Sequence, residues 1–262
     1  MGEKLHGRVM RISPARRLAA DYLAQARDVP LVALAREFHI PEVVRARRKM
    51  VPSISWVPIF SKAFARAAQS NVNLRWNWIK YPFARIYEHP ISECAVIVER
   101  EWAGEWVILA AKIRAPETMP LAEFDRHVRR FRDAPVREIS DFRQLLRLAA
   151  APKLLRWFAF WSSLHWSGAK RCKRFGTFMV SSLGNFGTET LTPIMPLTAY
   201  LTFGPITDDG RVTVGLIFDH RVMDGRHAAR ALQDMERLLN SEILDELAAL
   251  GPQIETTAPR QV

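Results

Sequence analysis

The sequence predicts an α+β fold in which a mixed β-sheet is covered by helices. Three observations lead to this prediction: residues 56–70 have apolar side chains at helical spacing, residues 92–114 contain two strand-like runs, and three more strand-like runs follow residue 175. The chain has 262 residues, 48% of them hydrophobic, with no internal repeat and no dividing linker. We therefore expect a single domain over 1–250 and a flexible tail at 251–262.

The first half is expected to begin with a helix at Ser13 and Pro14, because serine caps free N–H groups and proline tolerates the first helical position. A strand is predicted in VPLVALAREF, then a short basic helix after Pro41. The run SWVPIFSKAFARAAQ indicates an amphipathic helix packed on a core. SECAVIVER and EWVILAAKIR are expected to form a hairpin that turns near Ala103 and Gly104.

The second half is expected to contain helices in LAEFDRHVRRFRDA and ISDFRQLLRLAA, and a tryptophan-rich helix at the start of 152–175. Strands are predicted in GTFMVSSL, LTAYLTFGPI and RVTVGLIFD, with a tight turn at 208–210. A long helix is expected from about Gly225 to Asn240, followed by a shorter one in SEILDELAAL.

Composition and motifs limit the classes of binding partner that we expect. A formal charge of +11 suits nucleic acid, an anionic membrane or a phosphate-rich small molecule. The sequence has no zinc-finger, RRM or KH signature and no convincing helix-turn-helix, so we do not expect nucleic acid. Cys94 and Cys172 lack disulfide or metal-ligand spacing, which indicates reduced thiols and no metal. Because no secretory signal or membrane-spanning run is recognisable, a cytoplasmic location is expected.

The stretch FDHRVMDG, residues 218–225, places a histidine, then an aspartate and a glycine, between a predicted strand and a predicted helix. Histidine can take up and return a proton near neutral pH, so His220 is a candidate general base. Asp224 lies at the helix start, where capping and the helix dipole favour an acidic side chain. Taken alone, the pattern is more typical of a structural histidine at a strand–helix junction than of a catalytic one.

HRVMDG resembles the HxxxDG signature of the 2-oxoacid dehydrogenase E2 acyltransferases, which the related chloramphenicol acetyltransferases share. Upstream, GTFMVSSLGNFGTETLTPIMP is similar to that family's GTFTISNLG-x-FG segment. SISWVPIFSKAFARAAQ with NVNLRWNW, and the opening RISPARRLAADYLAQARDVPLVALAREF, resemble further family segments in the same order. The resemblance implies a chloramphenicol acetyltransferase-like two-layer sandwich that forms trimers, and a catalytic domain for CoA-dependent acyl transfer.

The resemblance also implies roles for individual residues. His220 matches the family's general base, which removes the thiol proton of coenzyme A or dihydrolipoamide before attack on a thioester. Ser181 matches the hydroxyl that donates to the oxyanion of the tetrahedral intermediate, whereas Ser182, asparagine in many relatives, is given no role. In the family's trimer, His220 would come from one subunit and Ser181 from the next.

Asp224 matches a residue that organises the histidine turn. The resemblance implies that it does so through a buried pair with a basic side chain near the first helix, which makes Arg16 and Arg17 the candidates. A simpler interpretation is that Asp224 caps its own helix. Coenzyme A phosphates would need cations or N–H groups, but no motif selects particular residues.

Two departures from the family affect function. The sequence has no lipoyl domain, no peripheral-subunit-binding domain and no Ala/Pro linkers, so a lipoyl or acyl group is expected from a separate carrier, or the acceptor differs. The segment 152–175 is longer and more aromatic than in relatives. Trp161 and His165 lie on one helical stripe, Trp157 widens it, and cations that include Arg156 and Arg171 flank it. It is predicted to pack on the protein, or to lie on an anionic membrane at the inner face of the cytoplasmic membrane.

The function predicted from these features is CoA-dependent acyl transfer between a thioester and a thiol or hydroxyl acceptor. Two alternatives stay open at this point. One is a non-catalytic trimeric scaffold of the same fold, and the other is acyl transfer to a lipid-like hydroxyl or amine at a membrane surface. Cys172 is expected to have a depressed pKa if it is exposed among the surrounding cations, although direct transfer needs no cysteine nucleophile.

Overall fold

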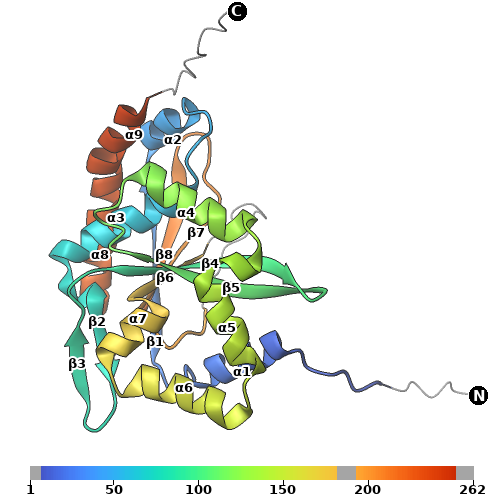
Figure 1. Ribbon diagram of the computed structural model, residues 1–262. Coiled ribbons are helices and arrows are strands. Elements are labelled where there is room, and N and C mark those ends of the chain that lie inside the picture. The colour runs from blue at the N-terminus through green and yellow to red at the C-terminus, as the bar shows by residue number, and fades with distance from the viewer. Residues whose placement is uncertain (1–6, 182–192, 252–262) are drawn as a thin grey trace, which may run out of the picture.

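A six-stranded mixed sheet forms the centre of the molecule (Figure 1). The computed structural model describes residues 7–181 and 193–251. The strand order is β1-β8-β7-β6-β4-β5, with β6 parallel to both of its neighbours and the other pairs antiparallel. The strands are β1 (Leu31–His39), β4 (Glu93–Trp102), β5 (Glu105–Arg114), β6 (Phe178–Ser181), β7 (Ala199–Phe203) and β8 (Arg211–Asp219). These strands and the mixed sheet confirm the sequence prediction.

The helices also fall where the apolar spacing predicts them. They are α1 (Pro14–Ala24), α2 (Pro41–Arg48), α3 (Trp56–Ser70), α4 (Leu121–Asp133), α5 (Ser140–Ala150), α6 (Lys153–His165), α7 (Gly168–Phe175), α8 (Gly225–Leu238) and α9 (Leu244–Leu250). Helix α1 begins as expected, because the Ser13 hydroxyl accepts the Arg16 backbone N–H at 3.1 Å. The β4–β5 hairpin turns through Ala103 and Gly104, which both have positive φ.

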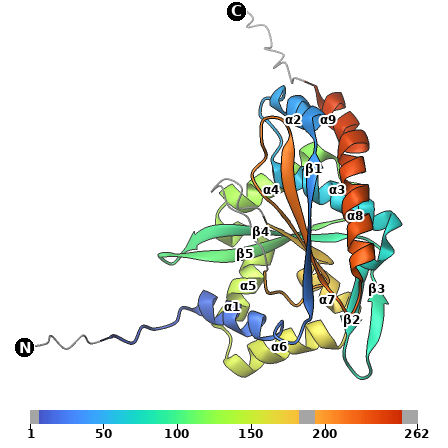
Figure 2. The same cartoon turned by 180° about the vertical axis from the view of Figure 1, so that it is seen from behind.

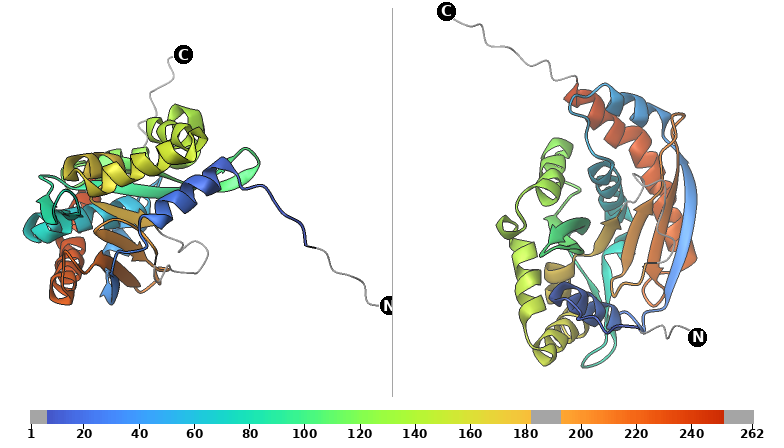
Figure 3. Two further views of the ribbon diagram at one scale, coloured as in Figure 1. Left: turned by 90° about the horizontal axis from the view of Figure 1, so that it is seen from below. Right: turned by 90° about the vertical axis from the view of Figure 1, so that its right-hand side faces the viewer.

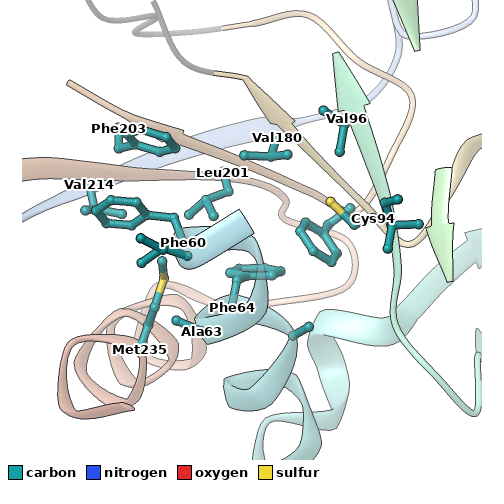
Figure 4. Close-up of a cluster of buried hydrophobic side chains, with 14 of the residues drawn as sticks. Phe60, Ala63, Phe64, Cys94, Val96, Val180, Leu201, Phe203, Val214 and Met235 are labelled. Atoms are coloured by element: carbon teal, nitrogen blue, oxygen red, sulfur yellow. The ribbon is translucent and has the colours of Figure 1, made fainter. Parts of the chain in front are cut away.

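The main core lies between one face of the sheet and helices α3, α4 and α8 (Figures 1 and 4). Phe60 of α3 stacks on Phe203 of β7 with ring centroids 4.3 Å apart, and Met235 of α8 is fully buried beside them. Phe64 packs against Phe178 of β6 in the same layer. Because β7 and most of β8 have no exposed side chains, this layer anchors the strand ends that carry the candidate site.

The opposite face of the sheet has a smaller cluster around Met179, Met195 and Tyr200. Helices α1, α5 and α6 lie on this side of the molecule, below the sheet in Figure 1 and toward the viewer in the left view of Figure 3. Ring contacts of 5.7 and 6.0 Å join Tyr22 of α1, Phe160 of α6 and Phe175 of α7. This aromatic group is therefore what holds the first helix to the tryptophan-rich segment.

Two features differ from the predicted elements. A separate two-stranded ribbon, β2 (Trp76–Ile79) and β3 (Arg85–Glu88), projects beside α6, and its second strand was not predicted (Figures 1 and 2). The four-residue strands are too short for periodicity to identify them. Helices α8 and α9 were predicted as separate, but a π-helical segment, Leu239–Ile243, joins them into one continuous run. The domain bounds 1–250 and 251–262 remain predictions, and residues 252–262 lie outside the described chain.

Candidate active site

The histidine turn connects the end of β8 to the start of α8. His220 directly follows the last residue of β8, and its backbone N–H donates to the Pro30 carbonyl oxygen at 2.9 Å, just before β1. Its imidazole lies 6.0 Å from the Phe218 ring, and its side chain is 48% exposed. The backbone of the candidate base is therefore held by two strands, while its ring can reach solvent or a neighbouring molecule.

Asp224 lies beside the imidazole. Its Oδ1 atom is 3.6 Å from Nδ1 of His220, longer than a hydrogen bond, and its side chain is 72% exposed. It is also the N-cap of α8, and its backbone N–H donates to Nδ1 of His227 at 3.3 Å. A carboxylate near Nδ1 favours the tautomer with hydrogen on that nitrogen, which leaves Nε2 available as a base.

A different acid forms the buried pair that holds this turn. The Asp219 carboxylate is fully buried and accepts the Arg221 guanidinium at 2.7 and 2.9 Å, as well as the Arg221 backbone N–H at 3.0 Å. The predicted buried pair of Asp224 with Arg16 or Arg17 is therefore wrong for the single chain, since all three side chains are exposed. The helix-capping interpretation of Asp224 agrees with the structure.

Arg171 links α7 to the same region. Its buried guanidinium donates to the carbonyl oxygens of Trp78, Leu164 and Pro196 at 2.6–3.3 Å. Burial lowers the pKa of Arg171, and the charge of Asp219 opposes that effect. Arg171, expected as a cation flanking the aromatic stripe, is therefore part of the interior of the fold.

Ser181 lies at the end of β6, which is separated from β8, the strand that leads to His220, by β7. Its side chain hydrogen-bonds Tyr200 of β7; burial raises the pKa of the Tyr200 phenol, and this bond opposes the rise. Ser181 is level with Thr202 and, through it, with Gly215 of β8. The last residue of β8 is four positions further along, or about 13 Å at a typical strand rise. One chain therefore does not bring Ser181 and His220 together.

An apolar cavity of about 500 Å³ lies on the Ser181 side of the sheet, enclosed by α1, α5, α6, α7 and strands β4 to β7. Its walls are mainly aliphatic and aromatic, and include Tyr22, Ile97, Leu145, Phe160, Met179 and Tyr200. Lys112 and Asp141, an ion pair at 2.9 Å, and Arg174 are the charged groups that line it. His220 is not part of the lining, but Tyr200 connects the cavity to Ser181.

The segment 152–175 folds as α6 and α7, and its parts differ in exposure. Arg156, expected as a flanking surface cation, is buried in an ion pair with Asp21 at 2.7 Å. Burial lowers the pKa of His165 to about 4, with Arg171, Lys80 and Arg221 adding repulsion. Cys172 is buried rather than exposed, and burial raises its pKa to about 12, so the condition for a depressed pKa is not met.

Four residues near the candidate site were not found from the sequence. Asp219 and Arg221 flank His220 along the chain, but only the fold shows that they form a buried pair. Tyr200 came from a strand with no distinguishing motif. His227 could have been noticed, because an N-cap aspartate followed three residues later by a polar side chain is a capping-box pattern. Ser182 and the rest of the GNFG segment, 182–192, lie outside the described residues.

The described part of the chain contains no group of three or more His, Cys, Asp or Glu side chains placed to bind a metal ion. None of its helices combines the length and apolar character that a bilayer-spanning segment requires.

Comparisons with known proteins agree with the motifs. Residues 173–245 match the family described as 2-oxoacid dehydrogenases acyltransferase (catalytic domain). No curated protein matches the sequence. A probable dihydrolipoamide acetyltransferase from Listeria monocytogenes has a similar structure, with a TM-score of 0.62 at 20% identity, covering 96% of this chain and 98% of that one.

Two further solved structures are similar. Dihydrolipoamide acetyltransferase (E2p) from Azotobacter vinelandii gives a TM-score of 0.63 at 19% identity over 91% of this chain and 94% of that one. The truncated catalytic core of a 2-oxoacid dehydrogenase multienzyme complex from Thermoplasma acidophilum gives 0.63 at 15% identity over 90% and 99%.

The fold of the whole chain is similar to that of E2 catalytic cores. The family match over 173–245, which includes the histidine turn, indicates an acyltransferase of the E2 catalytic-domain type. The chain resembles a dihydrolipoamide acetyltransferase catalytic domain, as the sequence motifs predicted, and the predictions of fold and enzyme class are confirmed.

Proposed function

We propose that this protein transfers acyl groups between coenzyme A and a second acceptor by direct attack, with His220 as the general base. The observation that carries the proposal is the position of the His220 imidazole. It stands at the end of a buried strand, half-exposed, with a carboxylate next to Nδ1. This arrangement leaves Nε2 to act on an incoming nucleophile. The Azotobacter structure was determined in a study of a serine, a histidine and an asparagine in catalysis, and those residue types agree in part with Ser181, His220 and Asp224.

In the proposed reaction, Nε2 of His220 removes the proton from the acceptor thiol or hydroxyl. The sulfur or oxygen forms a bond to the thioester carbonyl carbon, and the carbonyl oxygen becomes negatively charged. The intermediate then collapses, the bond to the coenzyme A sulfur breaks, and that sulfur takes the proton from the imidazolium. A base is needed because a free thiol is mostly protonated at neutral pH.

Ser181 is proposed to donate its hydroxyl hydrogen to the negatively charged oxygen of the intermediate. Its hydrogen bond with Tyr200 supports this role, because the phenol orients the serine at the end of β6. Asp224 is proposed to orient His220 and to cap α8, rather than to transfer a proton.

We further propose that the active site is shared between subunits of a trimer. The separation of Ser181 and His220 along the sheet supports this proposal, because the two side chains must approach the same thioester within hydrogen-bonding distance. A second copy would bring its Ser181 to the His220 of the first. One solved structure with a similar fold is itself part of a larger assembly, the cubic core of a pyruvate dehydrogenase multienzyme complex.

The cavity beside Ser181 favours a particular second candidate, acyl transfer to a lipid-like hydroxyl or amine. About 500 Å³ of mainly apolar space is suited to a hydrocarbon group. A lipoyl group delivered by a separate carrier remains the other proposed acceptor. The two proposed acceptors can be distinguished experimentally, because both reactions use the same base but differ in the group that occupies the cavity.

The test is acyl transfer from a panel of acyl-CoA donors to free dihydrolipoamide, long-chain alcohols and long-chain amines. His220→Ala is expected to lower kcat/KM by about 10²–10⁴-fold. His127→Ala, which removes a similarly exposed imidazole from α4, is the matched control and should retain activity. Undiminished turnover in His220→Ala would contradict the proposed base. If no donor reacts and millimolar coenzyme A does not raise the melting temperature, the scaffold interpretation is favoured instead.

A further inference from the structure

Helix α6 and the β2–β3 ribbon lie together at the end of the molecule below the sheet (Figures 1 and 3). Exposed apolar side chains of the helix and of the ribbon turn form one edge there. We call this surface the aromatic edge; it consists of Phe83, Leu154, Leu155, Trp157, Phe158 and Trp166. Leu154 is 81% exposed, Phe83 68% and Phe158 58%, and none of the six is buried. Isolated exposed apolar side chains are ordinary, but a contiguous group of this kind marks an interaction surface.

The aromatic edge is held together by a less exposed residue, Trp161. Its ring lies 6.0 Å from Trp157, 6.2 Å from Phe158 and 6.1 Å from Trp166. It also contacts Tyr81 of the ribbon turn at 5.4 Å. The exposed rings therefore stand on a preformed aromatic base and need no rearrangement to meet a partner.

Backbone hydrogen bonds join the ribbon to the helix. The Tyr81 N–H donates to the His165 carbonyl oxygen at 2.9 Å, and the Arg85 guanidinium donates to the Trp166 carbonyl oxygen at 3.1 Å. The same guanidinium lies over the Phe83 ring at 5.2 Å. Residues from two distant parts of the sequence thus share one surface. The stripe predicted within 152–175 did not include the ribbon residues.

Most of the charge around this edge is positive. The sequence has no Asp or Glu at 43–87 or at 142–188, which cover both helices and the ribbon up to its last residue, Glu88. Glu88 pairs with Arg75, and exposed Asp28, which follows α1, acts on the pKa of His165. Lys80 and Lys153 are exposed next to the apolar side chains, and Lys170 and Lys173 are exposed on α7, which packs against α6. Within the described chain these four lysines form no ion pair. An anionic partner would therefore meet unneutralised cations.

We propose that the aromatic edge binds the surface of an anionic membrane, with the aromatic rings at headgroup depth and the lysines against lipid phosphates. Exposed Trp and Phe beside Lys on an otherwise soluble-type fold suit an interfacial position. A second copy of the chain is a poorer occupant, because a symmetric contact would place like charges against each other. The proposal goes beyond acyl transfer, and it can fail or succeed whether or not His220 is the base.

The experiment is flotation of the full chain with vesicles of phosphatidylcholine alone and of phosphatidylcholine containing about 30% phosphatidylglycerol. Wild-type protein should float with the anionic vesicles only, and Trp157→Ser/Phe158→Ser should weaken that binding by about tenfold or more. Trp106→Ser, which removes an even more exposed aromatic side chain from β5, is the control and should bind like wild type. Circular dichroism and the melting temperature establish that each variant is folded.

A charge variant tests the second half of the proposal. Lys80→Glu/Lys153→Glu should weaken binding to anionic vesicles by at least about fivefold for each lysine replaced. Arg126→Glu/Arg130→Glu on α4 is the matched charge control. Failure of the wild type to bind anionic vesicles at low salt overturns the proposal. So does equal binding by Trp157→Ser/Phe158→Ser, which would indicate charge attraction without insertion. A fall in oligomer mass for that variant, with no vesicle binding by the wild type, would assign the edge to a subunit contact.

Discussion

Ser181 and His220 belong to the same sheet but lie at different levels of it. Ser181 ends β6 and is level with Gly215 of β8, two strands away. His220 directly follows the last residue of β8, which is four positions beyond Gly215. We have proposed that a second chain completes the site, because the reaction needs both side chains around one thioester. This relationship gives the shared-site proposal a direct experimental test.

Mixing two inactive variants should restore activity. In a random trimer of His220→Ala and Ser181→Ala subunits, each mixed trimer has one site with an intact histidine facing an intact serine. After co-refolding in equal amounts, activity should reach about a quarter of wild type, while each variant alone stays at its residual level. Co-refolding His220→Ala with the double variant is the control, since it can form no intact site. Equal activity in the two mixtures would show that the site lies within one chain.

The two acids of the histidine turn should differ in their effect on stability. Asp219→Ala removes a fully buried carboxylate that accepts hydrogen bonds from the partly exposed Arg221, and it should lower the free energy of unfolding by about 1.5–3 kcal/mol. Asp224→Ala removes an exposed helix cap and should cost only about 0.5–2 kcal/mol. Urea unfolding at one fixed protein concentration measures both. The reverse order would mean that Asp224, not Asp219, holds the turn.

Stability should fall in acid partly through His165. Burial lowers the pKa of this imidazole to about 4, so the unfolded chain binds more protons than the folded chain between about pH 4 and 6.5. The stabilising contribution of the neutral ring is therefore complete above about pH 6.5 and is lost as the pH falls toward 4. His165→Gln should show a smaller drop in melting temperature from pH 7 to pH 5 than wild type. His127→Gln is the control, and parallel curves for His165→Gln and wild type would contradict the prediction.

Both cysteines should be unreactive in the native protein. Burial raises the pKa of Cys94 and of Cys172 to about 12, and neither side chain has exposed surface. A disulfide reagent that reports free thiols should label neither residue in native protein and both in urea. Cys94→Ala isolates the signal of Cys172. Rapid labelling of that variant without denaturant would place Cys172 at an accessible site.

Much of the fold could be predicted because its signals are local. Ser13 caps α1, Ala103 and Gly104 turn the β4–β5 hairpin, and the apolar spacing of 56–70 defines α3. Each of these depends on residues within a few positions of one another, so it is visible in a linear sequence. The ribbon strand β3 was missed because a four-residue strand is stabilised by its partner rather than by its own pattern.

In the candidate site, too, some features were predictable from the sequence and others were not. His220, Asp224 and Ser181 were predicted from motifs, and their positions at the ends of β8 and β6 follow from short, ordered segments of sequence. The partner of each side chain could not be read in this way. Asp224 was assigned a buried pair with Arg16 or Arg17, yet the buried carboxylate is Asp219, because burial depends on which strands surround a residue.

The sequence by itself determined the order of helices and strands, because these depend on local spacing. The acyltransferase class and the candidate base followed from the resemblance of short, ordered motifs to a known family. Only the tertiary structure decided how far Ser181 lies from His220, which acid is buried, and that Phe83 joins Trp157 and Phe158 on one edge. Those relations arise from strand register and from contacts between distant segments, which no local pattern encodes.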